Sequence, residues 1–303
     1  MNFNDYNQKP IKTVSILNQT KVSSFVTSED SNLDKETVDS FGEEWLKFNA
    51  FTKDEINTAG SQYFDIVSEK ILNKNSVVLD LGCGSGRWSK YIAKKVKLIE
   101  AVDPSSAIYS AVKLNEDEEN VRVTQASVSN IPFEDETFDF VVCLGVLHHI
   151  PNTQEALKDV VKKLKSGGSI LLYLYYSLDN RGMLYKLLFK ISSIFRIIIS
   201  KLPKSLKKFV CDIIALVIYL PLVLLTRLLN VALGNKKWIQ KIPLSYYSDK
   251  TFRIIRNDAL DRFGTPLEQR FSKEEITQLM KNAGLSNIVF SNNEPYWHML
   301  GTK

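Results

Sequence analysis

The chain has 303 residues, of which 44% are hydrophobic and 24% are charged, and its formal net charge at pH 7 is +5. This composition excludes a disordered or fibrous chain and allows a full hydrophobic core. Its three cysteines include no Cys-x-x-Cys pair, which excludes a disulfide framework and suits a reducing compartment. The first twenty residues lack a basic stretch followed by a long apolar one, so we expect no secretory signal and a cytoplasmic protein.

Basic residues are concentrated in one segment. Residues 181–256 contain 15 lysines and arginines but only two acidic residues, Asp212 and Asp249, for a local charge of +13. The rest of the chain has 24 basic and 32 acidic residues. Because the basic segment is mainly aliphatic and has no recognition motif, we expect no nucleic-acid partner.

Two segments precede the main fold. Residues 1–40 are polar and aperiodic, and we predict a weakly ordered leader. Residues 41–75 are predicted to form a helical cap, with aromatic residues at helical spacing that pack on the next domain: Trp45, Phe48 and Phe51.

Strand and helix patterns then alternate over residues 76–176. Apolar strands are predicted at 76–82, 97–103, 121–127, 138–145 and 167–176, and helices at 86–96, 105–116 and 153–165. Such alternation implies right-handed crossovers and a parallel sheet covered on both faces. We therefore predict a doubly wound α/β core.

The alternation stops after Tyr176 and resumes near the C-terminus. A capping box at Ser272 opens a predicted helix that Gly284 ends, and a last strand is predicted at 295–302. We assign 177–256 as a helical insertion after the fifth strand. Residues 257–303 are predicted to complete the core.

The first strand of the core runs into a glycine loop in the stretch VVLDLGCGSGRW. Glycines at alternate positions allow a sharp bend and close approach of a ligand to the main chain: Gly82, Gly84 and Gly86. A dinucleotide fingerprint would need a third glycine where Arg87 stands, and would place phosphates beside Asp80. Because like charges repel, Asp80 favours a ligand with positive character. S-adenosylmethionine (SAM) fits, since it carries an ammonium and a sulfonium but no phosphate.

A second acid, Asp103, ends the second strand, where a carboxylate can accept both hydroxyls of a ribose. NAD sites share this feature, so Asp103 alone does not discriminate between the two ligands. Asp80, the glycine spacing and Asp103 together favour SAM. A nicotinamide-dependent oxidoreductase is a more distant alternative.

Four stretches resemble, in order and spacing, the motifs of class I SAM-dependent methyltransferases of the bacterial type 11 group: VLDLGCGSGRW, AVDPS, NIPFEDETFDFVVCLGVLHHI and LKSGGSILLYLYY. The resemblance covers roughly residues 76–176. It implies a Rossmann-like, seven-stranded sheet whose last strand is antiparallel. The sixth and seventh strands would lie within residues 271–301.

The same resemblance assigns residues to the cofactor site. These are Asp80, Gly82, Gly84, Gly86, Asp103, Ser127, Val128, Leu144 and Gly145. Asp80 and Gly82 would hold the amino-acid moiety, and Asp103 would bind the ribose. Ser127 stands where the family often has an aspartate, and its hydroxyl and the Val128 amide would meet the adenine. The two later glycines of the loop would line the sulfonium side, and the end of the fourth strand would pass close to the methyl group.

Methyl transfer to a hydroxyl needs an aligned acceptor and a base. His148 and His149 directly follow the fourth strand, and a neutral imidazole can take a proton near pH 7; a structural role is the alternative. The candidates for acceptor binding are Tyr173, Tyr176, Tyr246, Tyr247 and Arg262. Their alternatives are strand packing for the first two and a structural ion-pair network for the others. We expect no metal site.

The insertion has helical patterns over 183–230, with a narrow polar stripe on an otherwise apolar cylinder. Its uncharged run, 213–226, contains Pro221 and has 14 residues, whereas a bilayer span needs about 20, so no transmembrane helix is predicted. The helices could form a lid over the cofactor, or lie in a membrane interface with lysines facing anionic lipids: Lys201, Lys204, Lys207 and Lys208. Packing on the core and on one another is the third interpretation.

We therefore predict a cytoplasmic SAM-dependent methyltransferase, peripheral on the inner face of the membrane if the second interpretation holds. The expected acceptor is a hydroxyl of a small or lipid-linked molecule, such as an envelope saccharide. C-methylation of a lipophilic ring, such as a quinone precursor, is one alternative. A non-catalytic SAM-binding protein that docks on a membrane or a partner is another.

Overall fold

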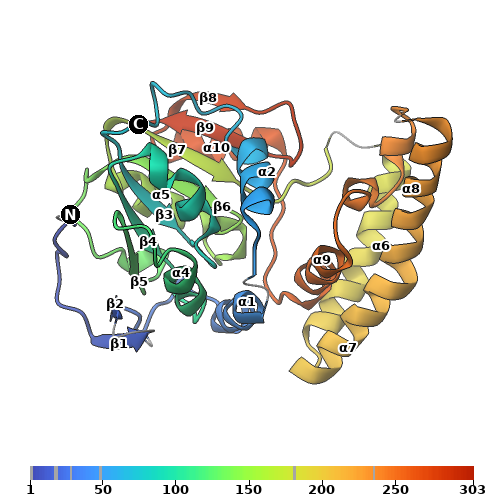
Figure 1. Ribbon diagram of the computed structural model, residues 1–303, viewed down its shortest axis with the longest axis horizontal. Coiled ribbons are helices and arrows are strands. Elements are labelled where there is room, and N and C mark those ends of the chain that lie inside the picture. The colour runs from blue at the N-terminus through green and yellow to red at the C-terminus, as the bar shows by residue number, and fades with distance from the viewer. Residues whose placement is uncertain (1–2, 17–19, 28, 48–49, 180–181, 235) are drawn as a thin grey trace. The chain divides into compact units, whose positions relative to one another are not determined.

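The computed structural model describes residues 3–16, 20–27, 29–47, 50–179, 182–234 and 236–303. The chain folds into two compact units (Figure 1). The α/β unit comprises Met1–Asp179 and Leu267–Lys303, and the helical unit comprises Asn180–Pro266. We describe each unit by itself.

A seven-stranded sheet forms the centre of the α/β unit, in the order β5-β4-β3-β6-β7-β9-β8. Its strands are β3 (Val77–Leu81), β4 (Leu98–Val102), β5 (Val121–Thr124), β6 (Phe138–Leu144), β7 (Leu164–Tyr173), β8 (Ser286–Phe290) and β9 (His298–Thr302). β9 pairs antiparallel with both of its neighbours, and the other pairs are parallel. The predicted doubly wound, Rossmann-like fold with an antiparallel last strand is therefore confirmed.

Helices cover both faces of this sheet. They are α3 (Arg87–Ile92), α4 (Ile108–Leu114), α5 (Thr153–Lys163) and α10 (Lys273–Asn282). Val78 packs in the hydrophobic core with α3 and α4, whereas Leu79 and Leu81 pack in the core with α5 and α10. A strand buried on both faces reads as a continuous apolar run, as β3 does. The charged exception in this strand is Asp80, which is only 1% exposed.

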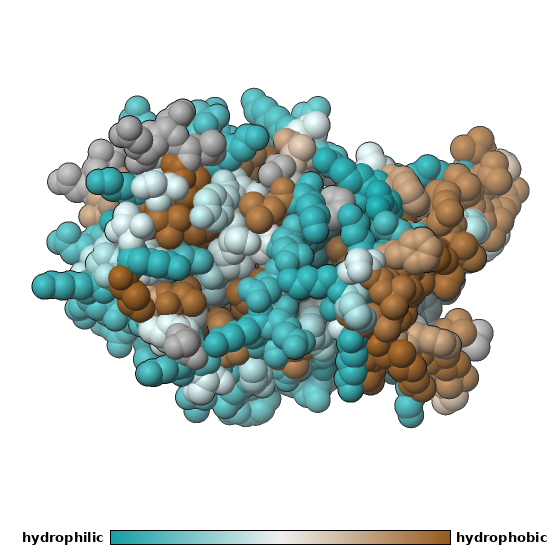
Figure 2. Space-filling view, turned by 90° about the horizontal axis from the view of Figure 1, so that it is seen from below, coloured by the Kyte–Doolittle hydropathy of each residue, from teal (hydrophilic) through white to brown (hydrophobic). Residues whose placement is uncertain are grey.

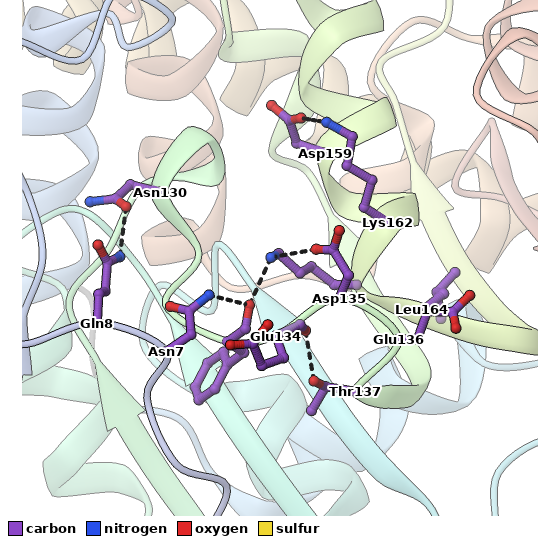
Figure 3. Close-up of polar contacts among 12 residues, drawn as sticks. Asn7, Gln8, Asn130, Glu134, Asp135, Glu136, Thr137, Asp159, Lys162 and Leu164 are labelled. Carbon is purple, nitrogen blue, oxygen red and sulfur yellow. Dashed lines mark hydrogen bonds and ion pairs between the residues drawn. The ribbon is translucent and has the colours of Figure 1, made fainter.

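The N-terminal segment differs from the predicted weakly ordered leader. Strands β1 (Lys12–Ile16) and β2 (Thr20–Ser24) form an antiparallel pair. Before them, Asn7 donates to the Phe133 carbonyl at 3.0 Å and Gln8 donates to Asn130 at 2.7 Å (Figure 3). Polar side chains and main-chain groups make these contacts, so a search for apolar periodicity does not detect them.

The predicted cap contains α1 (Lys35–Lys47), which begins before residue 41, and α2 (Lys53–Tyr63). α1 lies close to the start of α4: a Cβ at Gly42 would be 2.6 Å from Ser106 Oγ, and the Ser110 hydroxyl donates to the Trp45 carbonyl at 2.9 Å. Phe48, one of the three predicted packing aromatics, lies outside the described residues.

The helical unit contains α6 (Met183–Ser200), α7 (Lys204–Ile214), a π-helical turn (Ala215–Tyr219), α8 (Leu220–Leu233) and α9 (Phe252–Gly264). Because α9 continues to Gly264, this unit includes residues 257–266, which the sequence analysis placed with the core.

α7, the π-helical turn and α8 form one continuous helix, Lys204–Leu233, which we call the long helix. It has 30 residues, and its most apolar 18-residue window has a mean hydropathy of 2.5 and is 28% buried. By length and composition alone it is sufficient to cross a membrane, in contrast to the expectation from the shorter uncharged run. Pro221 does not end the helix; it stands in the first turn of α8, directly after the π-helical turn, and a first turn tolerates proline.

Candidate cofactor and acceptor site

The strand order reverses at β3, which lies between β4 and β6. Ligands of doubly wound sheets bind beyond the carboxyl ends of the strands at such a switch point. Five parallel strands, β3 to β7, end there, and predicted site residues lie at the end of each. In chain order these are Asp80 and the glycine loop, Asp103, Ser127 with Val128, Leu144 with Gly145, and Tyr173. The α/β unit thus brings all predicted cofactor residues to one edge of the sheet.

The glycine loop requires its glycines for two reasons. Gly84 and Gly86 have φ angles of +53° and +79°, in the left-handed region that side chains disfavour. A Cβ at Gly84 would lie 3.1 Å from Trp45 Nε1, and a Cβ at Gly86 would lie 2.4 Å from Asn115 Nδ2. The loop therefore leaves its main chain close to neighbouring groups on both sides.

Asp80 has one oxygen engaged and one without a partner. Its Oδ2 accepts hydrogen bonds from the Ser89 amide at 3.0 Å and the Ser89 hydroxyl at 2.6 Å. Its Oδ1 is buried and has no hydrogen-bond partner among the described residues. Burial raises the pKa of Asp80 to about 6, against the opposing effect of the Ser89 hydrogen bonds. A buried carboxylate with an unpaired oxygen is costly unless a donor or cation meets it, so this site fits the ammonium group of SAM.

The start of α3 argues against a dinucleotide. In dinucleotide sites the first amides of this helix face a pyrophosphate. Here the Ser89 amide, in the first turn of α3, is bonded to Asp80. Arg87 lies over the rings of Trp45, at 5.1 Å, and Trp88, at 4.4 Å. A carboxylate thus already uses one of the amides that a phosphate would need.

Asp103 is held rigidly beside the loop. Its Oδ1 accepts from the Ser105 amide at 2.8 Å and hydroxyl at 2.6 Å, and its Oδ2 accepts from the Gly84 amide at 2.9 Å. Burial raises its pKa above the usual value. Each carboxylate oxygen has further lone-pair capacity, so both can accept the two hydroxyls of a ribose. Further along this edge, the Ser127 side chain is 1% exposed and its hydroxyl lies 3.4 Å from that of Ser129.

α1 supplies a wall that the sequence analysis did not assign to the site. Trp45 adjoins the glycine loop at Gly84, and the Phe41 ring lies 4.7 Å from the His149 ring. The two aromatics are four residues apart and therefore share one face of the helix. That spacing was the available sequence signal, but only the fold shows which residues this face meets.

The two adjacent histidines have different environments. His149 donates from Nδ1 to the Leu267 carbonyl at 2.7 Å. His148 is fully buried, stacks on Tyr175 with ring centroids 3.9 Å apart, and has no hydrogen-bond partner at either ring nitrogen among the described residues. Burial lowers the pKa of His148 well below 6.5, and the charges of His149 and Arg270 lower it further. His148 is therefore neutral at pH 7.

A segment from the C-terminal part of the chain completes this cluster. The Gln269 amide donates to the His148 carbonyl at 2.9 Å, and the Arg270 guanidinium lies 5.0 Å from the centre of the Tyr175 ring. Arg270 also donates to Glu268 at 2.8 Å. Sequence analysis did not assign Glu268 or Arg270 to the site, because nothing local shows that residues after the insertion return to the end of β7.

The five predicted acceptor residues divide between the two units. Tyr173 lies in the cluster, with its ring 5.8 Å from that of Tyr175, whereas the Tyr176 ring packs 6.3 Å from that of Trp297. The helical unit holds the other three, Tyr246, Tyr247 and Arg262. Within that unit, Arg262 donates to Ser192 and Ser193 at 3.2 and 2.9 Å, Tyr247 donates to Asp258, and Tyr246 packs edge-on against Tyr247. These are the contacts of an internal polar network.

The order and direction of the strands are those of class I SAM-dependent methyltransferases. Residues 79–172 match the family model described as a methyltransferase domain, so the chain carries a domain of this family. The chain is a SAM-dependent methyltransferase with SAM as its cofactor. Among the described residues, no group of three or more His, Cys, Asp or Glu side chains could hold a metal ion.

The chain is similar to known proteins with different names. The ubiquinone biosynthesis O-methyltransferase of Coxiella burnetii (strain Dugway 5J108-111) is 26% identical over 168 residues, which cover 52% of this chain and 67% of that protein. A tRNA U34 carboxymethyltransferase of Nautilia profundicola is 31% identical over 36% of this chain and 37% of its own length. The solved complex of the Haloferax volcanii Trm112 methyltransferase activator with a methyltransferase contains a chain with a TM-score of 0.51 and 11% identity, covering 87% of this chain and 97% of that chain, which supports the fold.

Replacing Asp80 by asparagine should weaken the binding of S-adenosylhomocysteine roughly 10- to 100-fold, because a charge-assisted hydrogen bond contributes about 1.5–3 kcal/mol. Isothermal titration calorimetry at pH 7.5 measures this. Asp135→Asn, which removes the partner of an exposed Lys163 ion pair elsewhere in the unit, is the matched control and should bind normally. Unchanged affinity in Asp80→Asn would contradict the assignment.

Cofactor affinity should also depend on pH through Asp80. Its pKa in the free protein is about 6, so the carboxylate is ionised above this pH and protonated below it. Affinity for S-adenosylhomocysteine should be constant from pH 8 to 7 and fall by up to about tenfold per pH unit below 6. The same titration of Asp80→Asn should lack this dependence, and a flat wild-type profile from pH 8 to 5 would be inconsistent with the site.

Proposed function

We propose that the enzyme transfers the methyl group of SAM to a hydroxyl group of a small or lipid-linked molecule. The observation that carries this proposal is His148, a buried and neutral imidazole whose two ring nitrogens have no hydrogen-bond partner among the described residues. It lies three residues after Gly145, the predicted neighbour of the methyl group. A polar side chain in this state is expected to pair with a ligand group.

When bound, SAM would supply a methyl group activated by the positive sulfonium, whose sulfur would keep the electron pair of the broken S–C bond. The acceptor oxygen would supply the electron pair of the new bond to carbon. A hydroxyl attacks poorly until its proton is removed. Neutral His148 can accept that proton, and its low pKa keeps it unprotonated at pH 7. The stacked Tyr175 ring fixes the imidazole plane.

The surroundings of His148 favour an acceptor with a flat, apolar part. The rings of Tyr173 and Tyr175 lie 6.4 and 3.9 Å from the His148 ring, centroid to centroid. Such rings pack against aromatic groups and exclude water from the proton transfer. A phenolic hydroxyl meets these conditions and agrees with the name of the Coxiella relative. An acidic carbon of the same kind of ring is the second candidate, because it needs the same base.

The His148→Gln variant should lower kcat by about 10²–10⁴, the usual contribution of a general base. His149→Gln is the matched control and should lower kcat less than tenfold, because that ring is bonded to a main-chain carbonyl. Both variants should bind S-adenosylhomocysteine like the wild type. Equal losses in the two variants would argue for a merely structural role.

Wild-type kcat at saturating SAM should stay constant as pH falls from 8 to 6.5. The catalytic form of His148 is the neutral one, and its lowered pKa places the acid limb of the profile below pH 6.5. Residual turnover in His148→Gln should lack this limb. A wild-type limb centred above pH 6.5 would exclude His148 as the base.

Product analysis tests the reacting atom. Phenols and catechols with and without an isoprenoid chain, and a methyl glycoside, are incubated with ¹³C-methyl SAM, and the products are analysed by NMR. We expect an O-methyl resonance from a phenolic acceptor. A C-methyl product would instead support the second candidate, and methylation of the glycoside alone would point to a saccharide.

A further inference from the structure

The helical unit exposes many large apolar side chains. On α6 these are Met183, Leu187, Leu188, Ile191, Ile194, Phe195, Ile197 and Ile198, and on the long helix Leu206, Phe209, Ile213, Leu216, Val217, Ile218, Leu224, Leu225, Leu228, Val231 and Leu233. In Figure 2 the helical unit presents a large hydrophobic (brown) surface. Monomeric soluble proteins rarely expose contiguous apolar patches of more than a few hundred Å², so a patch of this kind marks an interaction site.

Only one side of the long helix packs within the unit. Its buried residues recur every three or four positions: Cys211, Ala215, Tyr219, Val223 and Thr226. The first four share a hydrophobic core with Ile255, Ala259 and Phe263 of α9. From Ile213 onward the other sides are also mainly apolar but remain exposed, which is the pattern of a helix whose environment outside the unit is also apolar.

After Lys208 the long helix contains two charged residues, and both have partners within the unit. Arg256 of α9 donates to both carboxylate oxygens of Asp212, at 2.9 and 2.6 Å. Arg227 donates to the main-chain carbonyls of Ser248 and Lys250, each at 2.6 Å. No other lysine, arginine, aspartate or glutamate occurs between Lys208 and Lys236. The outward face of the helix is therefore without charge over this length.

Positive charge is concentrated at both ends of that face. Lysines precede and begin the long helix at positions 201, 204, 207 and 208 and follow it at 236, 237 and 241. The unit as a whole has 16 basic and four acidic residues. An apolar face bordered by lysines is complementary to a bilayer with anionic head groups.

The charges of α9 restrict the orientation that the long helix can take in a bilayer. It packs along α7 and the π-helical turn, the middle of the long helix, and carries Arg253, Arg256, Asp258, Asp261 and Arg262. If the long helix spanned the membrane, these charges would lie at hydrocarbon depth, where each costs several kcal/mol. If the helix lies in the membrane plane, its apolar side enters the lipid and α9 stays on the aqueous side.

We propose that the helical unit is a monotopic membrane-binding element, with α6 and the long helix lying in the interface of a bilayer that contains anionic phospholipids. The apolar face enters the boundary between head groups and acyl chains, and the lysines at its two ends contact lipid phosphates. The unit attaches the enzyme to the membrane without crossing it.

The two chain connections to the helical unit begin close to the acceptor site within the α/β unit. The chain leaves the α/β unit after Asp179 and returns at Leu267, whose carbonyl bonds His149. Next to these points, Phe271 exchanges main-chain hydrogen bonds with Tyr175 and Ser177, each at 2.9 Å. Both connections therefore start beside the His148 cluster, so a lipid-linked acceptor in the same bilayer is the favoured substrate. This last step rests on the proposed function.

Vesicle sedimentation of the full chain tests the membrane element. We expect binding to vesicles of phosphatidylcholine with 30% phosphatidylglycerol, and at least tenfold weaker binding to phosphatidylcholine alone. The variant Val217→Glu with Leu228→Glu, changed at sites that are 64% and 68% exposed, should bind at least tenfold less. Its matched control, Ile11→Glu with Val289→Glu, changes residues of the α/β unit that are 58% and 50% exposed and should bind like the wild type.

Several outcomes would overturn the proposal. One is the absence of vesicle binding together with concentration-dependent dimerisation in analytical ultracentrifugation, which would make a second copy the occupant of the apolar face. Another is equal binding by the two double variants. Labelling of Lys208→Cys and Lys236→Cys on sealed vesicles with an impermeant maleimide distinguishes the orientations: both should react from outside, and protection of one would indicate a spanning helix.

Different variants test the membrane proposal and the proposed reaction separately. His148→Gln should bind vesicles normally while losing activity. Val217→Glu with Leu228→Glu should keep its activity on a water-soluble phenol but lose activity on a vesicle-embedded one. Loss of activity on both acceptors in that variant would contradict the separation of the two units' roles.

Discussion

One half-satisfied carboxylate determines the character of the cofactor site. Asp80 is the charged residue of an otherwise apolar strand, and Ser89 holds one of its oxygens while the other has no partner among the described residues. Burial without a counter-charge disfavours ionisation, which is why the pKa of Asp80 rises to about 6. A cationic ligand restores the balance, and a phosphate would worsen it. The choice of SAM over a dinucleotide follows from this one group.

The neighbouring features keep that carboxylate in place. The glycine loop bends with positive φ angles, the Gly84 amide holds Asp103, and Trp45 of α1 lies against the same glycine. Preorganised acceptors of this kind do not need to rearrange when a ligand binds. After β6, His148 is also buried without a hydrogen-bond partner at either ring nitrogen among the described residues. Two unpaired polar groups, one acidic and one basic, thus lie at the ends of the strands β3 and β6, where donor and acceptor are expected to meet.

Local patterns were sufficient to predict the α/β core. Apolar runs predicted the strands, the Ser272 capping box predicted the start of α10, and the glycine loop with Asp80 indicated the cofactor. Contacts between distant segments were not predictable in this way. Arg270 and Glu268 join His148 only because the chain returns after the insertion, and Gln8 meets Asn130 through polar contacts without periodicity. For the long helix, counting uncharged residues was misleading, since Asp212 and Arg227 are paired inside the unit and leave the outward face apolar.

The helical unit has a large exposed apolar face bordered by lysines. The central claim nevertheless concerns Asp80, and ¹³C NMR of its labelled carboxyl group tests it most directly. In the free enzyme this signal should titrate with a pKa of about 6, and saturation with S-adenosylhomocysteine should lower that pKa by at least one unit. A carboxyl that titrates at the same pH with and without the ligand would contradict the account.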